Sequence, residues 1–115
     1  MKSIQNLLMS LCQALNGIDE DITFYHYEKA EDFNGGKYGV WSEEGEADSD
    51  HEDNKKTNQV ISGSVDYFTT EEFDVIVDKV QETLNDLEGC SWRLDAVQYE
   101  DETSLIHYTW SWELV

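Results

Sequence analysis

The last twelve residues of the chain, SLIHYTWSWELV, constrain its fold most. Apolar and aromatic side chains alternate there with smaller polar ones, which is the period of a β-strand with one buried face. The side chains expected to point one way are Ile106, Tyr108, Trp110, Trp112 and Leu114, and those expected to point the other way are His107, Thr109, Ser111 and Glu113. We expect these aromatic rings to pack in the core against a second layer of structure. The alternative is that some of them lie in an interface between subunits.

Two segments have the periodicity of helices that would supply the second layer. Residues 4–15 are expected to form one helix, with Ser3 as its N-cap and Gly17 just past its end. Residues 69–89 are expected to form the other, with Thr69 as N-cap and Glu72 completing a capping box. The apolar stripe of the first contains Ile4, Leu7, Leu8, Leu11, Cys12 and Leu15, and that of the second contains Phe73, Ile76, Val77, Val80, Leu84 and Leu87.

The remaining regular segments are predicted to be strands. They cover residues 22–27, 37–46, 59–68, 91–100 and 104–115, and Gly63 marks a bulge or a close crossing within the third. The order of elements predicts an α+β fold: a two-layer sandwich with a mostly antiparallel or mixed sheet of about five strands and two helices packed on one face. The 115 residues are enough for a single domain, 1–115, with one core.

The charge of the chain is strongly negative. It has 26 acidic and 7 basic residues, for a net charge of -19. It also has 4 Trp, 6 Tyr and 4 Phe residues, which a disordered acidic tail would lack. Phosphates would be repelled, so sequence-specific nucleic-acid binding and binding to anionic membranes are not expected. No apolar run approaches the length of a membrane span, and no secretion signal is visible.

Residues 43–58 form the only break in composition, and they are predicted to be a mobile acidic loop because they lack apolar residues other than Ala47. We expect this loop to be an interaction site. Its candidate residues are Glu43, Glu44, Glu46, Asp48, Asp50, Glu52, Asp53, Lys55 and Lys56.

The same segment has part of the pattern of a calcium-binding loop. Asp48, Asp50 and Glu52 have the alternating spacing, but Asp53 stands where an EF-hand loop needs Gly, and Gln59 stands where it needs Glu. Weak, non-specific binding of divalent cations by Asp48, Asp50, Glu52 and Asp53 remains open, and a solvated loop without bound metal is the simpler interpretation.

No pattern indicates an enzyme or a resident cofactor. His26, His51 and His107 are expected to be ordinary residues with satisfied hydrogen bonds, and no glycine-rich phosphate loop follows a strand. Cys12 and Cys90 are isolated, so structural zinc is not expected. A disulfide between them stays open, although two thiols in a reducing cytoplasm are the simpler assumption.

Much of the chain resembles a known family. The strand ISGSVDYFT, the helix TEEFDVIVDKVQETL, the Trp92-Arg93-Leu94 strand and the stretch VQYEDETSLIHYTWSWEL all lie within residues 61–114. The turn at 99–103, followed by an aromatic strand, is the most specific part, and the N-terminal helix and WSEEGEA at 41–47 fit the same pattern. Together they resemble the tail-terminator, or tail-completion, proteins of long-tailed bacteriophages and prophages, which are also labelled minor capsid or tail-component proteins.

The resemblance implies a virion structural protein that forms a hexameric ring. Such a ring would sit on the last ring of tail tube protein, stop its polymerisation, and present its opposite face to the head–tail connector. The expected location is the virion tail, after assembly in the bacterial host cytoplasm. The family also has a long loop between two strands that becomes ordered on assembly, and residues 43–58 stand at that place in the chain.

Two interpretations that assign the chain to other functional classes of protein remain. One is a small acidic inhibitor that imitates DNA, and the other is an immunity-type binding module that neutralises a toxin. The net charge suits both, but a DNA mimic needs acids spaced along an elongated face, whereas residues 43–58 bunch many of them in one predicted loop.

Overall fold

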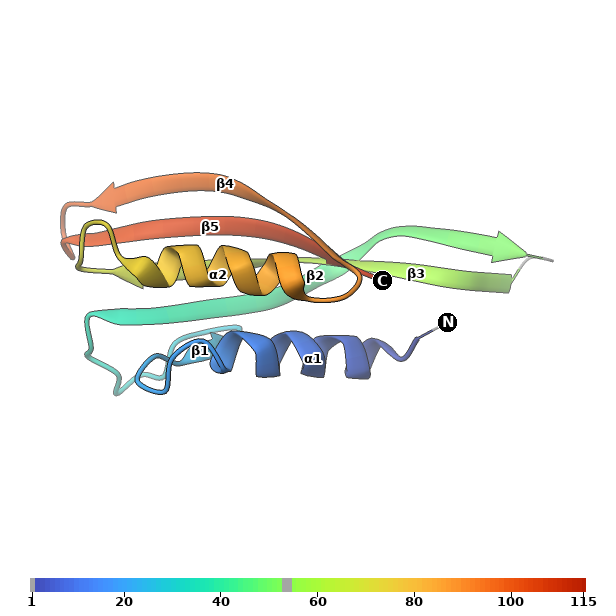
Figure 1. The fold of residues 1–115 in the computed structure, drawn as a ribbon, viewed down its shortest axis with the longest axis horizontal. Coiled ribbons are helices and arrows are strands. Elements are labelled where there is room, and N and C mark those ends of the chain that lie inside the picture. Colours follow the sequence, from blue (N-terminus) through green and yellow to red (C-terminus); the bar gives the residue numbers. More distant parts are fainter. Residues whose placement is uncertain (1, 53–54) are drawn as a thin grey trace.

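The computed structural model of the protein describes residues 2–52 and 55–115, with the backbone alone at 48–50 and 52. Helix α1 (Ile4–Asn16) precedes the short strand β1 (Phe24–His26) and the long strands β2 (Lys37–Glu52) and β3 (Lys55–Thr69). Helix α2 (Val75–Asp86) follows, and β4 (Cys90–Glu100) and β5 (Leu105–Leu114) complete the chain. Figure 1 shows both helices running along the sheet.

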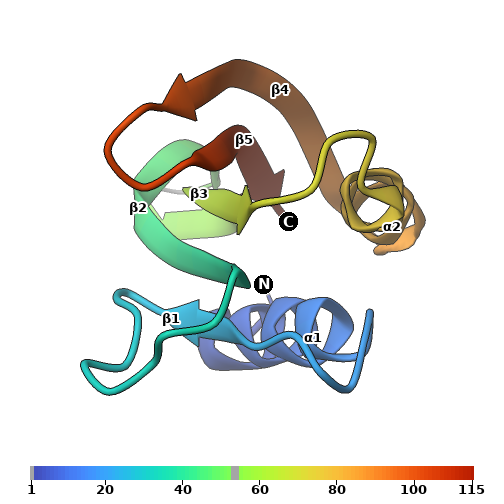
Figure 2. The same cartoon turned by 90° about the vertical axis from the view of Figure 1, so that its left-hand side faces the viewer.

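The five strands form one mixed sheet in the order β1-β2-β3-β5-β4. β1 pairs with β2 in parallel, and the other neighbours are antiparallel. The sheet curls, and Figure 2 shows α1 and α2 on the same side of it. The predicted α+β, two-layer fold is therefore confirmed.

The core lies between the helices and the inner face of the sheet. Every second side chain of β3 is buried from Ile61 onward. In β5 the buried side chains are Trp110, Trp112 and Leu114, which agrees with the predicted alternation of a strand. The helices contribute residues spaced three or four apart, which is one helical face. These buried helical residues are Leu8, Leu11 and Leu15 in α1 and Ile76, Val80 and Leu84 in α2.

The start of α2 differs from the prediction. Thr69 is the last residue of β3, and Asp74 is the N-cap, with its side chain accepting from Ile76 N–H at 2.9 Å. The other carboxylate oxygen of Asp74 accepts from the hydroxyls of Thr69 and Tyr67, each at 2.7 Å. Because these two buried hydroxyls need a partner, they favour Asp74 as the cap over Thr69.

Phe73 was wrongly predicted to lie on the buried face of this helix. The residue precedes the N-cap, has a φ of 56°, and its side chain is 93% exposed. The later helix start removes it from the 3.6-residue periodicity that placed it among the apolar positions. The N-terminal helix agrees with the prediction, since Ser3 is the N-cap and Gly17 the C-cap.

Gly63 is a close crossing, one of the two roles the sequence allowed. A Cβ at this position would lie 2.2 Å from the Ser42 carbonyl oxygen and 2.3 Å from Cζ2 of Trp112. Trp112 pairs with Gly63 across β3 and β5, so its indole occupies the space that a side chain would take. The glycine therefore allows a tryptophan to pack flat in the centre of the sheet.

We predict that Gly63→Ala lowers the free energy of unfolding by about 1–3 kcal/mol, because the new methyl group overlaps backbone and a buried ring. Gly45→Ala is the matched control, since its Cβ would meet nothing within 4 Å. Urea denaturation of both variants measures the difference. Equal stability of the two alanine variants would contradict the account of Gly63.

Candidate functional site on the acidic hairpin arm

Strands β2 and β3 continue together beyond the rest of the sheet. β3 pairs with β5 only from Ile61 onward, whereas β2 and β3 pair as far as Glu52 and Lys55. Residues 48–52 and 55–60, called the arm below, therefore pair only with each other. The arm projects from one end of the body in Figure 1, and the molecule is 53 Å long but only 26 Å and 24 Å across.

The prediction of a loop at 43–58 is wrong for the residues that the structure describes. Residues 43–52 belong to strand β2 and residues 55–58 belong to strand β3. The prediction relied on the lack of apolar side chains, but an antiparallel ladder is built from backbone hydrogen bonds and does not require burial. Register shifts between Glu43 and Gly45, Glu46 and Asp48, and Asp50 and His51 interrupt the ladder. Such shifts increase the local twist of a two-stranded ribbon.

Glu46 and Lys56 join the two strands at the base of the arm. The Lys56 ammonium donates to a Glu46 carboxylate oxygen at 2.6 Å, and the Gln59 amide donates to the same oxygen at 2.8 Å. The hydrogen bond from Lys56 is the main cause that holds the pKa of Glu46 below its ordinary value. Lys56 pairs with His51 in the ladder, so its side chain reaches back along the arm to Glu46 and links the two strands.

Glu43 makes different contacts, near β1. Its carboxylate lies 2.7 Å from Nε2 of His26, whose ring is stacked between Tyr27 and Trp41 at centroid distances of 3.8 Å and 4.0 Å. Burial raises the pKa of Glu43, but hydrogen bonds from its own backbone N–H, from His26 and from Tyr27 outweigh it, so the net pKa lies below the ordinary value. Glu43 is therefore held in the body of the protein rather than in the arm.

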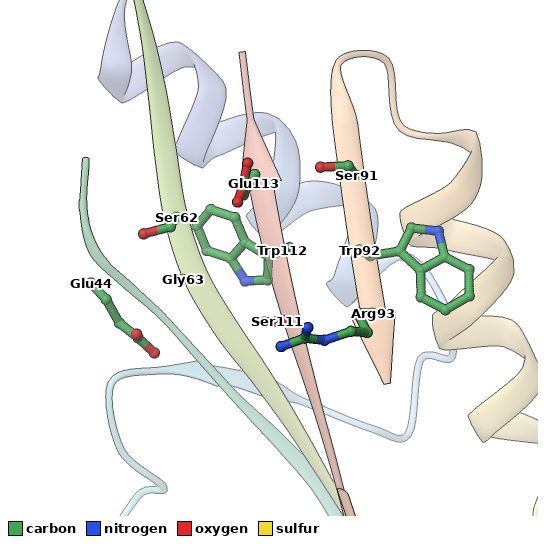
Figure 3. Close-up of a pocket in the computed structure, with 9 residues that line it drawn as sticks. All are labelled: Glu44, Ser62, Gly63, Ser91, Trp92, Arg93, Ser111, Trp112 and Glu113. Carbon is green, nitrogen blue, oxygen red and sulfur yellow. The ribbon is translucent and has the colours of Figure 1, made fainter. Parts of the chain in front are cut away.

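Glu44 lies at a shallow groove on the outer face of the sheet, shown in Figure 3. The groove has a volume of about 290 Å³ and is open to solvent. Its other polar walls come from three different strands, and the indole of Trp112 lies beside Gly63 in the same view. These polar walls belong to Ser62, Ser91, Arg93, Ser111 and Glu113.

The remaining predicted site residues are placed only in part. Asp48, Asp50 and Glu52 have backbone positions in β2, but their side chains lie outside the part that the structure describes, as does the whole of Asp53. Lys55 is exposed at the start of β3. Weak divalent binding by the four acids therefore stays a prediction.

Two of the histidines lie in strands and have hydrogen-bond partners, as predicted. His26 pairs with Glu43, and Nε2 of His107 lies 2.8 Å from Asp66 Oδ1. The Asp66 oxygen also accepts from the Thr109 hydroxyl at 2.7 Å. The His107 ring stacks on Phe68 at 4.1 Å, which links β3 and β5 on the outer face. The sequence placed His107 and Thr109 on that face but gave no means of pairing them with Asp66.

The two cysteines are free thiols in this structure. Both are half-buried and pack against the core cluster. Burial raises the pKa of Cys90 to about 11, so its thiol stays protonated at neutral pH.

Neither the models of known protein families nor the curated proteins give a match to this chain. Within residues 2–52 and 55–115, neither helix has the length and apolar character needed to cross a bilayer.

We predict that Glu43→Gln costs about 1 kcal/mol of stability at neutral pH, through loss of a partly buried charged hydrogen bond. Because the folded pKa of Glu43 is lowered, its contribution is complete above the unfolded value of about 4.3 and is lost as pH falls through the folded pKa. The difference from wild type in urea denaturation should therefore shrink as pH falls below about 4.3, and it should vanish once pH lies below the folded pKa.

Glu44→Gln is the control for this prediction, because Glu44 is exposed and should change stability by less than about 0.5 kcal/mol. A Glu43→Gln effect that equals the Glu44→Gln effect, or one that does not decrease as pH falls below about 4.3, would contradict the assignment.

Proposed function

We propose that the protein is a virion structural and assembly protein that caps the tail tube of a long-tailed bacteriophage as a ring, stops its polymerisation and joins the tail to the head. The resemblance to tail-terminator proteins over residues 61–114 and 41–47 suggests this class. The observation that carries the proposal is the arm. A two-stranded extension projects from the body at the position where that resemblance implies a segment engaged in assembly.

The charge of the chain suits this role. A hexameric ring of copies, each with a net charge of -19, would surround a channel with negative charge, so DNA would pass without adhering. The same charge opposes contact between copies. Ring closure should therefore be helped by salt, by divalent cations or by basic surfaces on the tail tube protein and the connector. The proposal gives the protein no catalytic residue and no resident cofactor.

A DNA-mimicking inhibitor is the second candidate, and one observation favours it. The acids of residues 43–52 are spread along a strand of an elongated molecule rather than bunched in a loop, so they come closer to the spaced array that a mimic needs. Specific binding of a nuclease, without any ring or tube capping, would select this function.

We predict that Asp48→Asn, Asp50→Asn and Glu52→Gln in the arm, together with Asp53→Asn, which lies outside the described residues, let rings form at lower salt and remove most of their response to magnesium. Repulsion between the arms of neighbouring copies is the physical reason. Analytical ultracentrifugation across a salt series, with and without magnesium, measures the mass in solution.

The matched control removes four exposed acids from the body by Glu20→Gln, Glu28→Gln, Glu31→Gln and Asp32→Asn. It should change the salt dependence less than the arm variant does. If the arm variant keeps the mass and the cation response of wild type, the arm has no role in assembly.

A further inference from the structure

Strand β4 has a free edge. It is the last strand of the sheet, and within the described chain only β5 pairs with it. At 11 residues it is much longer than β1, the 3-residue strand at the opposite edge. An exposed edge of this length presents a row of unpaired backbone N–H and C=O groups, which is the template on which an added strand pairs.

The side chains on the inner face of β4 are apolar and incompletely covered. The register pairs Leu94 with Trp110, Val97 with Tyr108 and Tyr99 with Ile106, so all three side chains share the face on which the helices lie. Their exposed fractions are 41% for Leu94, 52% for Val97 and 63% for Tyr99. The register of β4 against β5 shifts between Leu94 and Ala96, so the edge has two regular parts. A strand added along either part would place every second side chain on this face.

A groove lies between α2 and Trp92 of β4, two residues before Leu94 in the same strand. Its volume is about 450 Å³, and its walls are formed by Asp78, Gln81, Glu82, Asn85, Asp86 and Trp92. The indole N–H of Trp92 donates to the Asn85 side-chain oxygen at 3.2 Å, which joins the two walls. One wall is thus an aromatic ring on the edge strand, and the other is a helix flank with three carboxylates.

These three carboxylates are exposed, and the described part of the chain gives none of them an ion pair with a basic side chain. Lys79 is the only cationic residue in the sequence of α2. Like charges at 78, 82 and 86 recur at four-residue spacing, which destabilises an isolated helix. An occupant with cationic side chains would relieve this repulsion, and it would also meet the face of Trp92.

We propose that the β4 edge and this groove form a docking site for an extended, basic segment of a partner protein, which joins the sheet as an added strand. Lysine or arginine side chains on one face of that segment would meet Asp78, Glu82 and Asp86. Apolar side chains further along the same face would contact Val97 and Tyr99. Backbone pairing supplies affinity that is independent of side chains, and the acidic wall selects for a basic segment.

A second copy of this chain is a poor occupant. Its basic residues are Lys2, Lys29, Lys37, Lys55, Lys56, Lys79 and Arg93. No two of them are two positions apart, as one face of a strand requires, and the chain as a whole is repelled by its net charge of -19. The inference uses neither the arm nor the ring, so the two proposals can fail separately.

The probe for this site is a fluorescent peptide with lysine at every second position of one half, valine at the same alternate positions of the other half and threonine between them, so that lysines and valines share one face of a strand. Its binding is measured by anisotropy near physiological salt. Asp78→Asn, Glu82→Gln and Asp86→Asn together should weaken its binding about tenfold or more, as expected for three modest charge interactions. The control, Glu28→Gln, Glu31→Gln and Asp32→Asn, removes the same charge elsewhere and should weaken binding by less than about threefold, because distant charges are screened.

Strand addition is tested with a modified peptide, and the place of the docked segment is tested with two lysines beside the edge. A peptide of the same sequence with alternating N-methylated residues cannot pair its backbone and should bind at least about tenfold more weakly. Val97→Lys with Tyr99→Lys, at exposed positions, should also weaken the unmodified peptide by adding repulsion beside the edge.

Three results would overturn the proposal. The first is equal weakening by the groove and control variants, and the second is equal affinity for the N-methylated peptide, since either indicates general charge attraction. The third is a fall in the mass of the free protein on Val97→Lys and Tyr99→Lys, which would assign the edge to a second copy.

Discussion

The backbone ladder between β2 and β3 is the interaction on which the rest of the structure depends. Within the body, β3 lies between β2 and β5 and buries Val65 and Tyr67 beneath the helices. Gly63 lets Trp112 pack across the same strand. Beyond the body the ladder continues without a core, so the strands that hold the sheet together also carry the acidic segment outward as the arm.

Negative charge is spread over several exposed parts of the molecule. The arm, the exposed flank of α2 and the loop between β1 and β2 all carry carboxylates, while only 7 residues of the chain are basic. A few acids are held by internal partners, as Glu43 is by His26 and Glu46 by Lys56. Repulsion among the other acids is relieved by salt, cations or basic surfaces, so under the proposed function assembly would depend on charge.

The sequence was sufficient to predict the structure where the spacing of apolar residues matches the pattern of buried side chains. It predicted the α+β class, the alternation in β5 and the caps of α1, because each follows from local spacing of side chains. It failed at Phe73 and in the acidic segment. Tertiary hydrogen bonds to Asp74 moved the start of α2, and a backbone ladder extended strands into a region without apolar residues. The groove beside β4 depends on strand order, which local patterns do not encode.

Electron microscopy of tail tubes assembled with this protein tests the central claim most directly. If the protein caps the tube as a ring, averaged images should show a six-fold annulus at one end of each tube, and tube growth from that end should stop. Tubes that keep growing with both ends bare, while the protein remains a single-copy particle in solution, would contradict the account.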